Sequence, residues 1–360
     1  MKKLASNNIE QFREDLVNWF LEEQRVLPWR MNKDPYRVWV SEIMLQQTRV
    51  DTVIPYYERF MEWFPTLEDF AEADEERILK AWEGLGYYSR VRNLHAAVKE
   101  VKESYGGTVP NTPEEISRLK GVGPYTAGAI LSIAYGLPEP AVDGNVMRVL
   151  SRILEIYDDI AKPATRKVFE QAVREVIDHD HTSEFNQALM ELGALICTPT
   201  KPSCLLCPVR EHCQAFEKGL QQELPVKTKA KKTKTVQLSA LVLIDKSGRM
   251  VIRKRPSSGL LAGLWEFPNY EVSGMEDLKQ IMAKEHHLVI EDIRPIGQIS
   301  HVFSHLVWEI TAYEARVENV ERFTEEGRKT AFVRDEDFKD YALPVSHQKI
   351  YEAHLMNEKQ

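Results

Sequence analysis

The chain has 360 residues, which is too long for one ordinary hydrophobic core and predicts two domains. Apolar residues make up 43% of it, yet no apolar run is long enough to cross a bilayer, which argues against a membrane protein. The formal net charge of −8 argues only weakly against a nucleic-acid partner, because a phosphate-binding surface can be local.

The N-terminal segment indicates the compartment. "MKKLASNNIEQFRE" begins with basic residues, but no apolar stretch follows them, so it is not a secretory signal. We therefore expect a cytoplasmic protein. Structural disulfides are not expected in that compartment.

Residues 1–216 are predicted to be helical, without strand-like alternation. In "NNIEQFREDLVNWFLEEQ" the apolar residues recur at helical spacing and form one face. They are Ile9, Phe12, Leu16, Trp19 and Phe20.

Capping signals predict where later helices begin and end. Thr48 is expected to cap a helix, with Asp51 three residues later. In "NTPEEISRLK", Thr112 is the expected N-cap, Pro113 occupies the first helical position and Glu115 completes the capping box. Four glycines predict helix ends: Gly84, Gly86, Gly106 and Gly107.

The stretch "RLKGVGPYTAGAI" predicts a tight turn between two helices. Gly121 and Gly123 allow the backbone to approach a ligand closely. The N–H groups at the start of the next helix then favour an anion such as a DNA phosphate. A plain helix–helix turn is the alternative.

Two carboxylates have surroundings that suggest chemistry. Glu42 lies in the apolar helix "YRVWVSEIMLQQTRV", where burial would raise its pKa and let it hold a proton near neutral pH. Asp143 follows the glycine turn by about twenty residues, in "AVDGNVMRVLSR", and precedes a helix. The alternatives are a surface glutamate and an ordinary helix cap.

All four cysteines of the chain lie between residues 197 and 213, spaced C-x6-C-x2-C-x5-C. A zinc site more often has two C-x-x-C pairs separated by a longer span, whereas a [4Fe–4S] cluster takes four close thiolates. We therefore predict a [4Fe–4S] cluster, with zinc as the alternative. The four ligands would be Cys197, Cys204, Cys207 and Cys213.

A change of composition divides the chain after residue 216. The lysine-rich "PVKTKAKKTKT" predicts a basic linker over residues 217–234. Beyond it, "TVQLSALVLIDKSGRMVIRKRP" has two β-rich runs around a Ser-Gly turn, and "ISHVFSHLVWEITAYEARV" is strand-like. One helix is expected over "MEDLKQIMAKEHH", so residues 235–360 are predicted to form an α+β domain.

The turn, the aspartate and the cysteine spacing, in this order, resemble the helix–hairpin–helix DNA glycosylases related to endonuclease III. Within that superfamily, "LPWR", "SEIMLQQTRV", "GLGYYSRVRNL", "VDGNV" and "FNQALMELGALIC" resemble the MutY family of adenine-specific mismatch glycosylases. The implied fold is multidomain: an all-α helix–hairpin–helix glycosylase domain with a [4Fe–4S] loop over 197–213, then an α+β Nudix-like domain.

The second domain carries its own resemblance. "SGLLAGLWEFPNYEV" is similar to the Nudix-hydrolase fold, but the helix "MEDLKQIMAKEHH" lacks the cluster of glutamates that binds Mg²⁺ in Nudix hydrolases. We expect a domain that recognises a base and has lost hydrolysis.

The MutY resemblance implies a monofunctional glycosylase that flips out and hydrolyses adenine paired with 8-oxoguanine or guanine, which initiates base excision repair. Glu42 would be the general acid and then the base, and Asp143 would stabilise the oxocarbenium ion. Tyr125 and Asn145 would position Asp143 and water. Tyr125 also occupies the position of the lysine nucleophile of lyases, and a phenol cannot form a Schiff base.

The resemblance assigns further residues to DNA contacts. The adenine pocket would be lined by Arg25, Trp29, Arg30, Leu45 and Gln187, although Trp29 and Leu45 also suit core packing. Gln47 and Tyr87 would wedge into the base stack. The backbone of Gly121, Val122 and Gly123 would meet phosphates, and the carbonyls of Ser117, Leu119 and Val122 would hold a cation. In "HVFSHLVW", 8-oxoguanine would be read by Phe303, Ser304 and His305, where the alternative is a β-turn of mixed polarity.

The resemblance implies double-stranded DNA with an A:8-oxoguanine or A:G mismatch as the partner, bound by a monomer. It also implies a bacterial origin and a cytoplasmic protein that is associated with the nucleoid when it is bound to DNA. One alternative is a bifunctional glycosylase/lyase for oxidised pyrimidines, and Tyr125 argues against it. The other is a non-catalytic, cluster-bearing DNA-binding or redox protein. The joint presence of Glu42 and Asp143 argues against that one.

Overall fold

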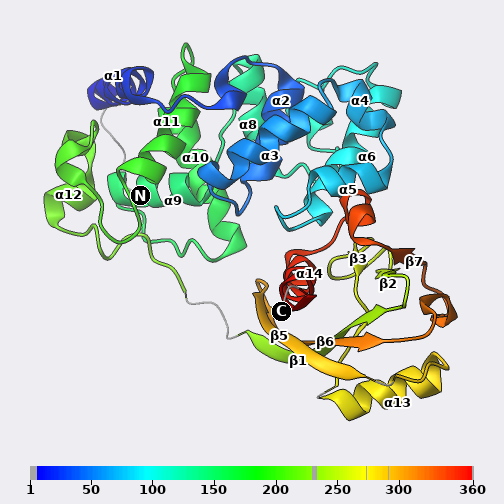
Figure 1. Cartoon of the computed structure of the whole chain (residues 1–360). Helices are drawn as coiled ribbons and strands as arrows, with labels where there is room; N and C mark the ends of the chain where they lie inside the picture. Colours follow the sequence, from blue (N-terminus) through cyan, green and yellow to red (C-terminus); the bar gives the residue numbers. More distant parts are fainter. Residues whose placement is uncertain (1–5, 229–232, 273, 291, 359–360) are drawn as a thin grey trace. The chain divides into compact units, whose positions relative to one another are not determined.

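The computed structural model describes residues 6–228, 233–272, 274–290 and 292–358. The chain divides into two compact units (Figure 1). The first comprises Met1–Glu72 and Asn93–Ala230, and the second comprises Ala73–Arg92 and Lys231–Gln360. Three lysines of the expected linker, Lys229, Lys231 and Lys232, lie outside the described residues. The domain boundaries at 216/217 and 234/235 stay a prediction.

The described part of the first unit is helical and contains no strand, which confirms the prediction from periodicity. None of the described helices of the whole chain is long and apolar enough to cross a membrane. The elements are α1 (Ser6–Glu23), η1 (Pro28–Arg30), α2 (Pro35–Leu45), α3 (Val50–Trp63), α4 (Leu67–Glu72), α6 (Ser89–Ser104, which crosses the division), α7 (Pro113–Ile116), α8 (Pro124–Tyr135), α9 (Gly144–Ile153), η2 (Pro163–Thr165), α10 (Arg166–Val176), α11 (Thr182–Leu195), η3 (Cys204–Leu206), η4 (Arg210–His212) and α12 (Gln214–Lys218).

The capping predictions had mixed outcomes. Thr112 caps α7, because its Oγ1 accepts a hydrogen bond from the N–H of Glu115 at 3.3 Å, and Pro113 is the first helical residue. Thr48 does not cap α3, so that prediction was wrong: the N-cap is Arg49, which makes no side-chain cap. Thr48 belongs instead to the turn after α2, where its N–H donates to the carbonyl of Leu45.

The predicted glycine helix ends are confirmed by backbone angles. Gly84 and Gly86 follow α5 (Glu75–Ala81), and their φ angles are 95° and 77°. Gly106 and Gly107 follow α6 with φ angles of 60° and 78°. Glycine tolerates this left-handed conformation because it has no Cβ.

The core of the first unit joins the N-terminal helix to the helices that carry the site. Phe12 and Phe20 of α1 are buried against Val149 of α9, Phe169 of α10 and Phe185 of α11. Three of the cysteines pack against the same core: Cys197, Cys207 and Cys213. The cysteine loop is therefore supported by the packed helices that carry the cavity residues described below.

The second unit is built on a mixed sheet that has seven strands among its described residues. Its path is β3-β2-β1-β6-β5, with β4 paired to β1 and β7 paired to β2. β1 and β6 run parallel, with Ser239 opposite Thr311, and the other pairs are antiparallel. The elements are α5, β1 (Lys234–Ile244), β2 (Met250–Lys254), β3 (Trp265–Glu266), β4 (Asn269–Tyr270), α13 (Met275–Glu285), β5 (Ile293–Val302), β6 (Leu306–Arg316), η5 (Val320–Arg322), β7 (Thr330–Val333), η6 (Asp335–Asp340) and α14 (Val345–Glu358).

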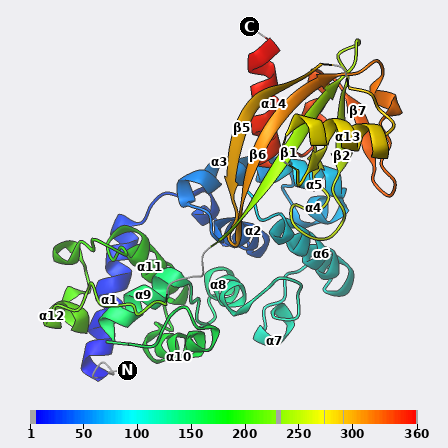
Figure 2. The same cartoon turned by 90° about the horizontal axis from the view of Figure 1, so that it is seen from below.

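The two longer helices of this unit cover opposite faces of the sheet, as Figure 2 shows. Ile350 of α14 belongs to the core on one face, and Leu278 and Met282 of α13 belong to the core on the other. The helix expected over 275–287 is thus confirmed as α13. The strand-like stretch from 299 to 317 forms most of the β5–β6 hairpin, whose turn holds residues 303–305.

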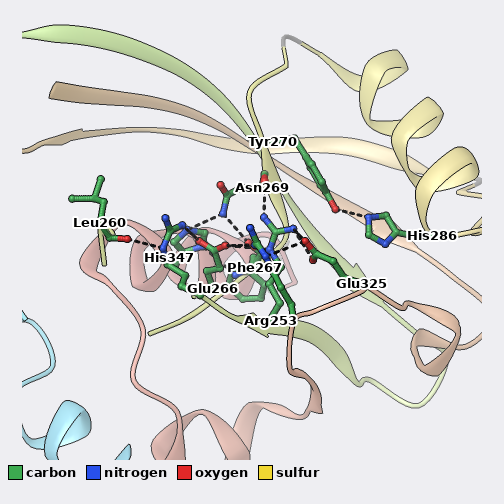
Figure 3. Close-up of polar contacts among 11 residues, drawn as sticks. Arg253, Leu260, Glu266, Phe267, Asn269, Tyr270, His286, Glu325 and His347 are labelled. Atoms are coloured by element: carbon green, nitrogen blue, oxygen red, sulfur yellow. Dashed lines mark hydrogen bonds and ion pairs between the residues drawn. The ribbon is translucent and has the colours of Figure 1, made fainter. Parts of the chain in front are cut away.

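A buried charge network stabilises the edge of this sheet (Figure 3). Glu266 is fully buried, and its Oε1 lies 3.1 Å from Nε of Arg253, its register partner across β2 and β3. Arg253 also pairs with Glu325 at 2.8 Å. Burial lowers the pKa of His347 to about 4, so its neutral Nδ1 accepts the N–H of Phe267 at 3.1 Å. The carboxylate of Glu266 is therefore already paired with arginine side chains of the protein.

Candidate active site

A cavity of about 380 Å³ in the first unit is lined by all the residues predicted for catalysis and for the base pocket except Tyr125. Its walls come from the segment after α1, from α2, from the start of α9 and from α11. The predicted residues that line it are Arg25, Trp29, Arg30, Glu42, Leu45, Asp143, Asn145 and Gln187.

Glu42 lies on α2 with only 5% of its surface exposed. The hydroxyl of Tyr125 donates to Glu42 Oε2. Burial raises the pKa of Glu42 to about 7, and the nearby charge of Asp143 adds to this effect. The Tyr125 hydrogen bond and the charge of Arg30 oppose it. A carboxyl group with this pKa can both donate and accept a proton at neutral pH.

Tyr125 is the second residue of α8, and its hydroxyl lies 3.4 Å from Sδ of Met190. Burial and the neighbouring carboxyl of Glu42 raise the pKa of Tyr125, so the phenol stays protonated. It acts as a hydrogen-bond donor that fixes the rotamer of Glu42.

Asp143 caps α9, as the structural alternative predicted, and it also lines the cavity. Its Oδ1 accepts the N–H of Val146 at 2.8 Å, and its Oδ2 accepts Nδ2 of Asn145 at 2.8 Å. Burial raises the pKa of Asp143, although these hydrogen bonds favour the carboxylate and limit the rise. The cap therefore holds the carboxylate in one orientation at the cavity wall.

Asn145 is itself held by a neighbouring arginine. Nη2 of Arg148 donates to Asn145 Oδ1 at 2.8 Å and to the carbonyl of Gly193 at 2.7 Å, which directs the Asn145 amide nitrogen toward Asp143. Nε of Arg148 donates to the carbonyl of Cys197 at 2.8 Å. The backbone of α11 lies close to α9 at this point, because a Cβ at Gly193 would lie 2.6 Å from Cβ of Asn145. Only glycine permits this packing of α11 against α9.

Glu191 was missed in the sequence and is the most heavily bonded carboxylate of the cavity. Arg25 donates to it from Nε and Nη2, each at 2.8 Å, and Arg30 donates from Nη2 at 3.0 Å. Nε of Arg30 also donates to Oε1 of Gln187 at 3.1 Å. A signal was present: Glu191 lies one helical turn after Gln187 in the apolar helix "FNQALMELGAL".

Gln47 and Tyr87 share an uncommon backbone conformation. Their φ angles are 59° and 50°, in the left-handed region that non-glycine residues rarely occupy, and both side chains are exposed. Such strain costs about 1–3 kcal/mol and concentrates at functional sites. The structure therefore presents each of these side chains on a constrained turn.

Within the second unit, Tyr87 lies beside the predicted recognition turn. Its hydroxyl is 3.0 Å from Oγ of Ser304. Both line a cavity of about 450 Å³, together with Phe303 and His305. Ser304 and His305 are exposed, whereas Phe303 packs edge-on against Trp308 with ring centroids 4.8 Å apart. Phe303 thus packs the turn against the sheet, and the side chains of Ser304 and His305 remain exposed at the tip of the turn.

The glycine turn has the predicted helix–hairpin–helix form. Gly121 has a φ angle of 78°, and a Cβ there would lie 2.7 Å from Cβ of Asn93. Gly123 is the N-cap of α8 and offers no side chain, so the first N–H groups of α8 lack a side-chain cap. Ser117 is the C-cap of α7, and the carbonyl of Leu119 accepts the N–H of Val122 at 3.1 Å.

The four cysteines line one small apolar cavity of about 20 Å³ with Arg152, whose Nη1 lies 3.2 Å from Sγ of Cys197. Burial raises the pKa of Cys207 to about 12 and that of Cys213 to about 11. Within residues 6–228, 233–272, 274–290 and 292–358, no three thiol, imidazole or carboxyl groups are grouped as ligands of a single metal ion.

Two carboxyl groups at the wall of one cavity, next to a helix–hairpin–helix turn, define the class of protein: a base excision DNA glycosylase. The sequence matches the HhH-GPD superfamily of base excision DNA repair proteins over residues 40–175 and the NUDIX domain over residues 239–353. Among solved structures, a thermostable thymine-DNA glycosylase has a TM-score of 0.54 and 28% identity, with 59% of this chain and 100% of that chain covered.

Curated relatives identify the particular family. The adenine DNA glycosylase of Rattus norvegicus is 35% identical over 96% of this chain and 78% of its own length. That of Homo sapiens is 33% identical over 95% of this chain and 74% of its own length, and that of Buchnera aphidicola from Acyrthosiphon pisum is 31% identical over 95% and 97%. The chain belongs to the adenine DNA glycosylase family, and it excises adenine in base excision repair.

Proposed function

We propose that the adenine removed is the one paired with 8-oxoguanine or guanine in duplex DNA, and that the enzyme leaves an abasic site without cutting the strand. The observation that carries this proposal is the pair Glu42 and Asp143 at one cavity, with the pKa of Glu42 near 7. Adenine inside a duplex is out of reach, so it must be flipped into the cavity.

The chemistry begins with the leaving group. Glu42 donates its proton to N7 of adenine, the bond between the base nitrogen and the sugar C1′ breaks, and the electron pair leaves with the base. The sugar becomes an oxocarbenium ion, which the carboxylate of Asp143 stabilises. Water then attacks C1′, and Glu42 accepts its proton as general base.

The neighbouring residues hold these two carboxyl groups in place. Tyr125 donates to Glu42, and Asn145 donates to Asp143, so each carboxyl has a fixed partner. Tyr125 offers no amine for a Schiff base, which supports a monofunctional enzyme over a lyase.

The base would be recognised by the cavity wall. Gln187 presents an amide suited to an adenine edge, and Arg30 orients that amide. Trp29 is 7% exposed and lines the same cavity, as does Leu45 at the end of α2. These two supply an apolar surface for the flipped ring.

We assign the contacts with the DNA strands to exposed turns of the protein. Gln47 and Tyr87 would occupy the base stack, and their constrained backbones support that role. Gly121, Val122 and Gly123 would bind phosphate at the start of α8, where no side chain caps the helix. Carbonyls of Ser117, Leu119 and Val122 would hold a cation there.

The four cysteines fit a [4Fe–4S] cluster. They line one cavity, and a [4Fe–4S] cluster takes four thiolate ligands. Cys197, Cys204, Cys207 and Cys213 would hold the cluster, which would fix the loop 197–213 for DNA contact. We propose that the protein acts as a monomer in the cytoplasm, and the bacterial relatives support that location.

The proposed cluster can be tested by measuring the iron content of the protein. Purified protein should be brown and contain about four irons per chain. Iron and zinc assays on protein purified without oxygen check this. Stoichiometric zinc without iron would refute the cluster.

Substitutions in the turn at residues 303–305 should change the selectivity for the base opposite adenine. Ser304→Ala combined with His305→Ala removes the two polar side chains at the tip, so the preference for adenine opposite 8-oxoguanine over guanine should fall by about tenfold. Single-turnover excision on the two duplexes measures the ratio.

Ser300→Ala is the matched control, because Ser300 lies on the same hairpin and bonds Glu309 at 2.8 Å on the surface. It should leave the ratio unchanged. If the double variant kept the same ratio of excision opposite 8-oxoguanine to excision opposite guanine, the turn would have no part in recognising the opposite base.

A further inference from the structure

Glu191 is the point where two arginines of the cavity converge. The residue lies on α11 with 2% of its surface exposed. Its oxygens accept Nε and Nη2 of Arg25 at 2.8 Å each, Nη2 of Arg30 at 3.0 Å and Nη1 of Arg30 at 3.3 Å. The N–H of Arg25 adds a further bond at 3.2 Å. One buried carboxylate thus holds two guanidinium groups.

This contact sets the charge of the cavity wall. The hydrogen bonds from Arg25 and Arg30 lower the pKa of Glu191 to about 2, so it is ionised at every pH at which the enzyme works. Within this group of three side chains, two positive charges against one negative charge leave a net charge of +1. Without Glu191 the two guanidinium groups would lose the buried carboxylate that they share, and Coulomb interactions are strong where solvation is poor.

The contact also sets an orientation. Nη1 of Arg30 donates to the carbonyl of Arg25 at 3.1 Å, and its Nε donates to Gln187 Oε1 at 3.1 Å. The Gln187 amide nitrogen donates to Oγ of Ser183 at 3.1 Å. Glu191 therefore fixes Arg30, and Arg30 fixes which way the Gln187 amide points.

We propose that Glu191 is a positioning residue for adenine excision: it keeps Arg25 and Arg30 charge-compensated, so that the cavity tolerates the positive charge of protonated adenine and of the sugar cation. The proposal rests on the proposed function, specifically on the roles of Glu42 and Asp143. Glu191 acts through the arginines and need not touch the substrate.

The charged and titratable groups that act on Glu42 come from three elements. Tyr125 faces it from α8, Asp143 acts from the start of α9, and Arg30 acts from η1. Arg30 already lowers the pKa of Glu42. Loss of Glu191 leaves Tyr125 and Asp143 in place and strengthens the field of Arg30, so the proton of Glu42 should be lost at a lower pH.

The first experiment measures single-turnover adenine release against pH. The acid form of Glu42 is required, so the rate of the unchanged protein should fall as pH rises through about 7. In Glu191→Gln this fall should move to lower pH by about one unit, and the rate at neutral pH should drop about tenfold. Glu191→Asp keeps the charge and should keep the position of the fall, even with a lower rate.

Two further variants separate charge from packing. Glu184→Gln is the matched control, because Glu184 lies on the same helix and pairs with Lys33 at 3.1 Å near the surface. It should change neither rate nor profile. In the double variant Glu191→Gln with Arg30→Gln, one positive charge is removed with the negative one. The pH at which the excision rate falls should return to that of the unchanged protein, although the rate itself stays low.

The second experiment does not depend on turnover. Binding is compared for duplexes that carry a cationic pyrrolidine or a neutral tetrahydrofuran in place of the adenosine sugar. Glu191→Gln should lose about tenfold of the preference for the cation, because one more positive charge faces it. Circular dichroism confirms that each variant is folded.

An equal loss of rate at all pH values, with unchanged cation preference, would show that Glu191 only packs the cavity and would overturn the proposal. Failure of the double variant to restore the profile would do the same, and this holds even where Glu191→Gln is too unstable to assay. If Glu42→Gln or Asp143→Asn excises adenine at the original rate while Glu191→Gln still weakens cation binding, the proposed roles of Glu42 and Asp143 fail and the role of Glu191 stands.

Discussion

Glu42→Gln is expected to bind mismatched duplex DNA normally and to release almost no adenine. Glutamine keeps the shape of the side chain and can still accept the hydrogen bond from Tyr125, but it has no acid proton. General acid catalysis contributes about 10²–10⁴-fold, and we expect the upper end because unprotonated adenine is a poor leaving group. Single-turnover kinetics measure the chemical step free of product release.

Glu62→Gln provides the comparison, since Glu62 is an exposed residue of α3 away from the cavity. It should excise adenine at the original rate. Excision by Glu42→Gln within about threefold of that rate would mean that Glu42 is not the acid, because a lost proton donor costs at least about a hundredfold.

Asp143→Asn is expected to lose about 10²–10³-fold in excision rate, because it removes the negative charge that faces the oxocarbenium ion. The effect should not arise from unfolding: Asp143 caps α9 through the N–H of Val146, and asparagine caps helices as well as aspartate does. The melting temperature should therefore stay close to that of the unchanged protein. Single-turnover excision and thermal melting together check both expectations.

Asp74→Asn tests whether the cap alone matters. Asp74 caps α5 through the N–H of Arg77 at 2.8 Å and does not line the cavity, so this variant changes a cap without changing the cavity charge. It should retain full excision. Full activity in Asp143→Asn would leave Asp143 as a helix cap and move cation stabilisation elsewhere.

Elements that depend on neighbours in the chain were predictable. The N-cap at Thr112, the glycine ends of α6 and the apolar face of α1 follow from contacts between residues a few positions apart. The failure at Thr48 has a physical reason of the same kind. A local cap signal competed with the turn that closes α2, and the N–H of Thr48 bonds Leu45 there.

The sequence by itself determined the helical first part, the strand-rich second part, the four-cysteine motif and, through resemblance, eight of the residues that line the cavity. Only the tertiary structure decided how they act. Arg25 and Glu191 are 166 residues apart and meet because α1 and α11 pack against each other. The pKa of Glu42 rises because α2 is buried, and it is tuned by Tyr125, Asp143 and Arg30 from three other segments. Charge and burial depend on what the fold brings into contact, and no local pattern in the chain specifies that.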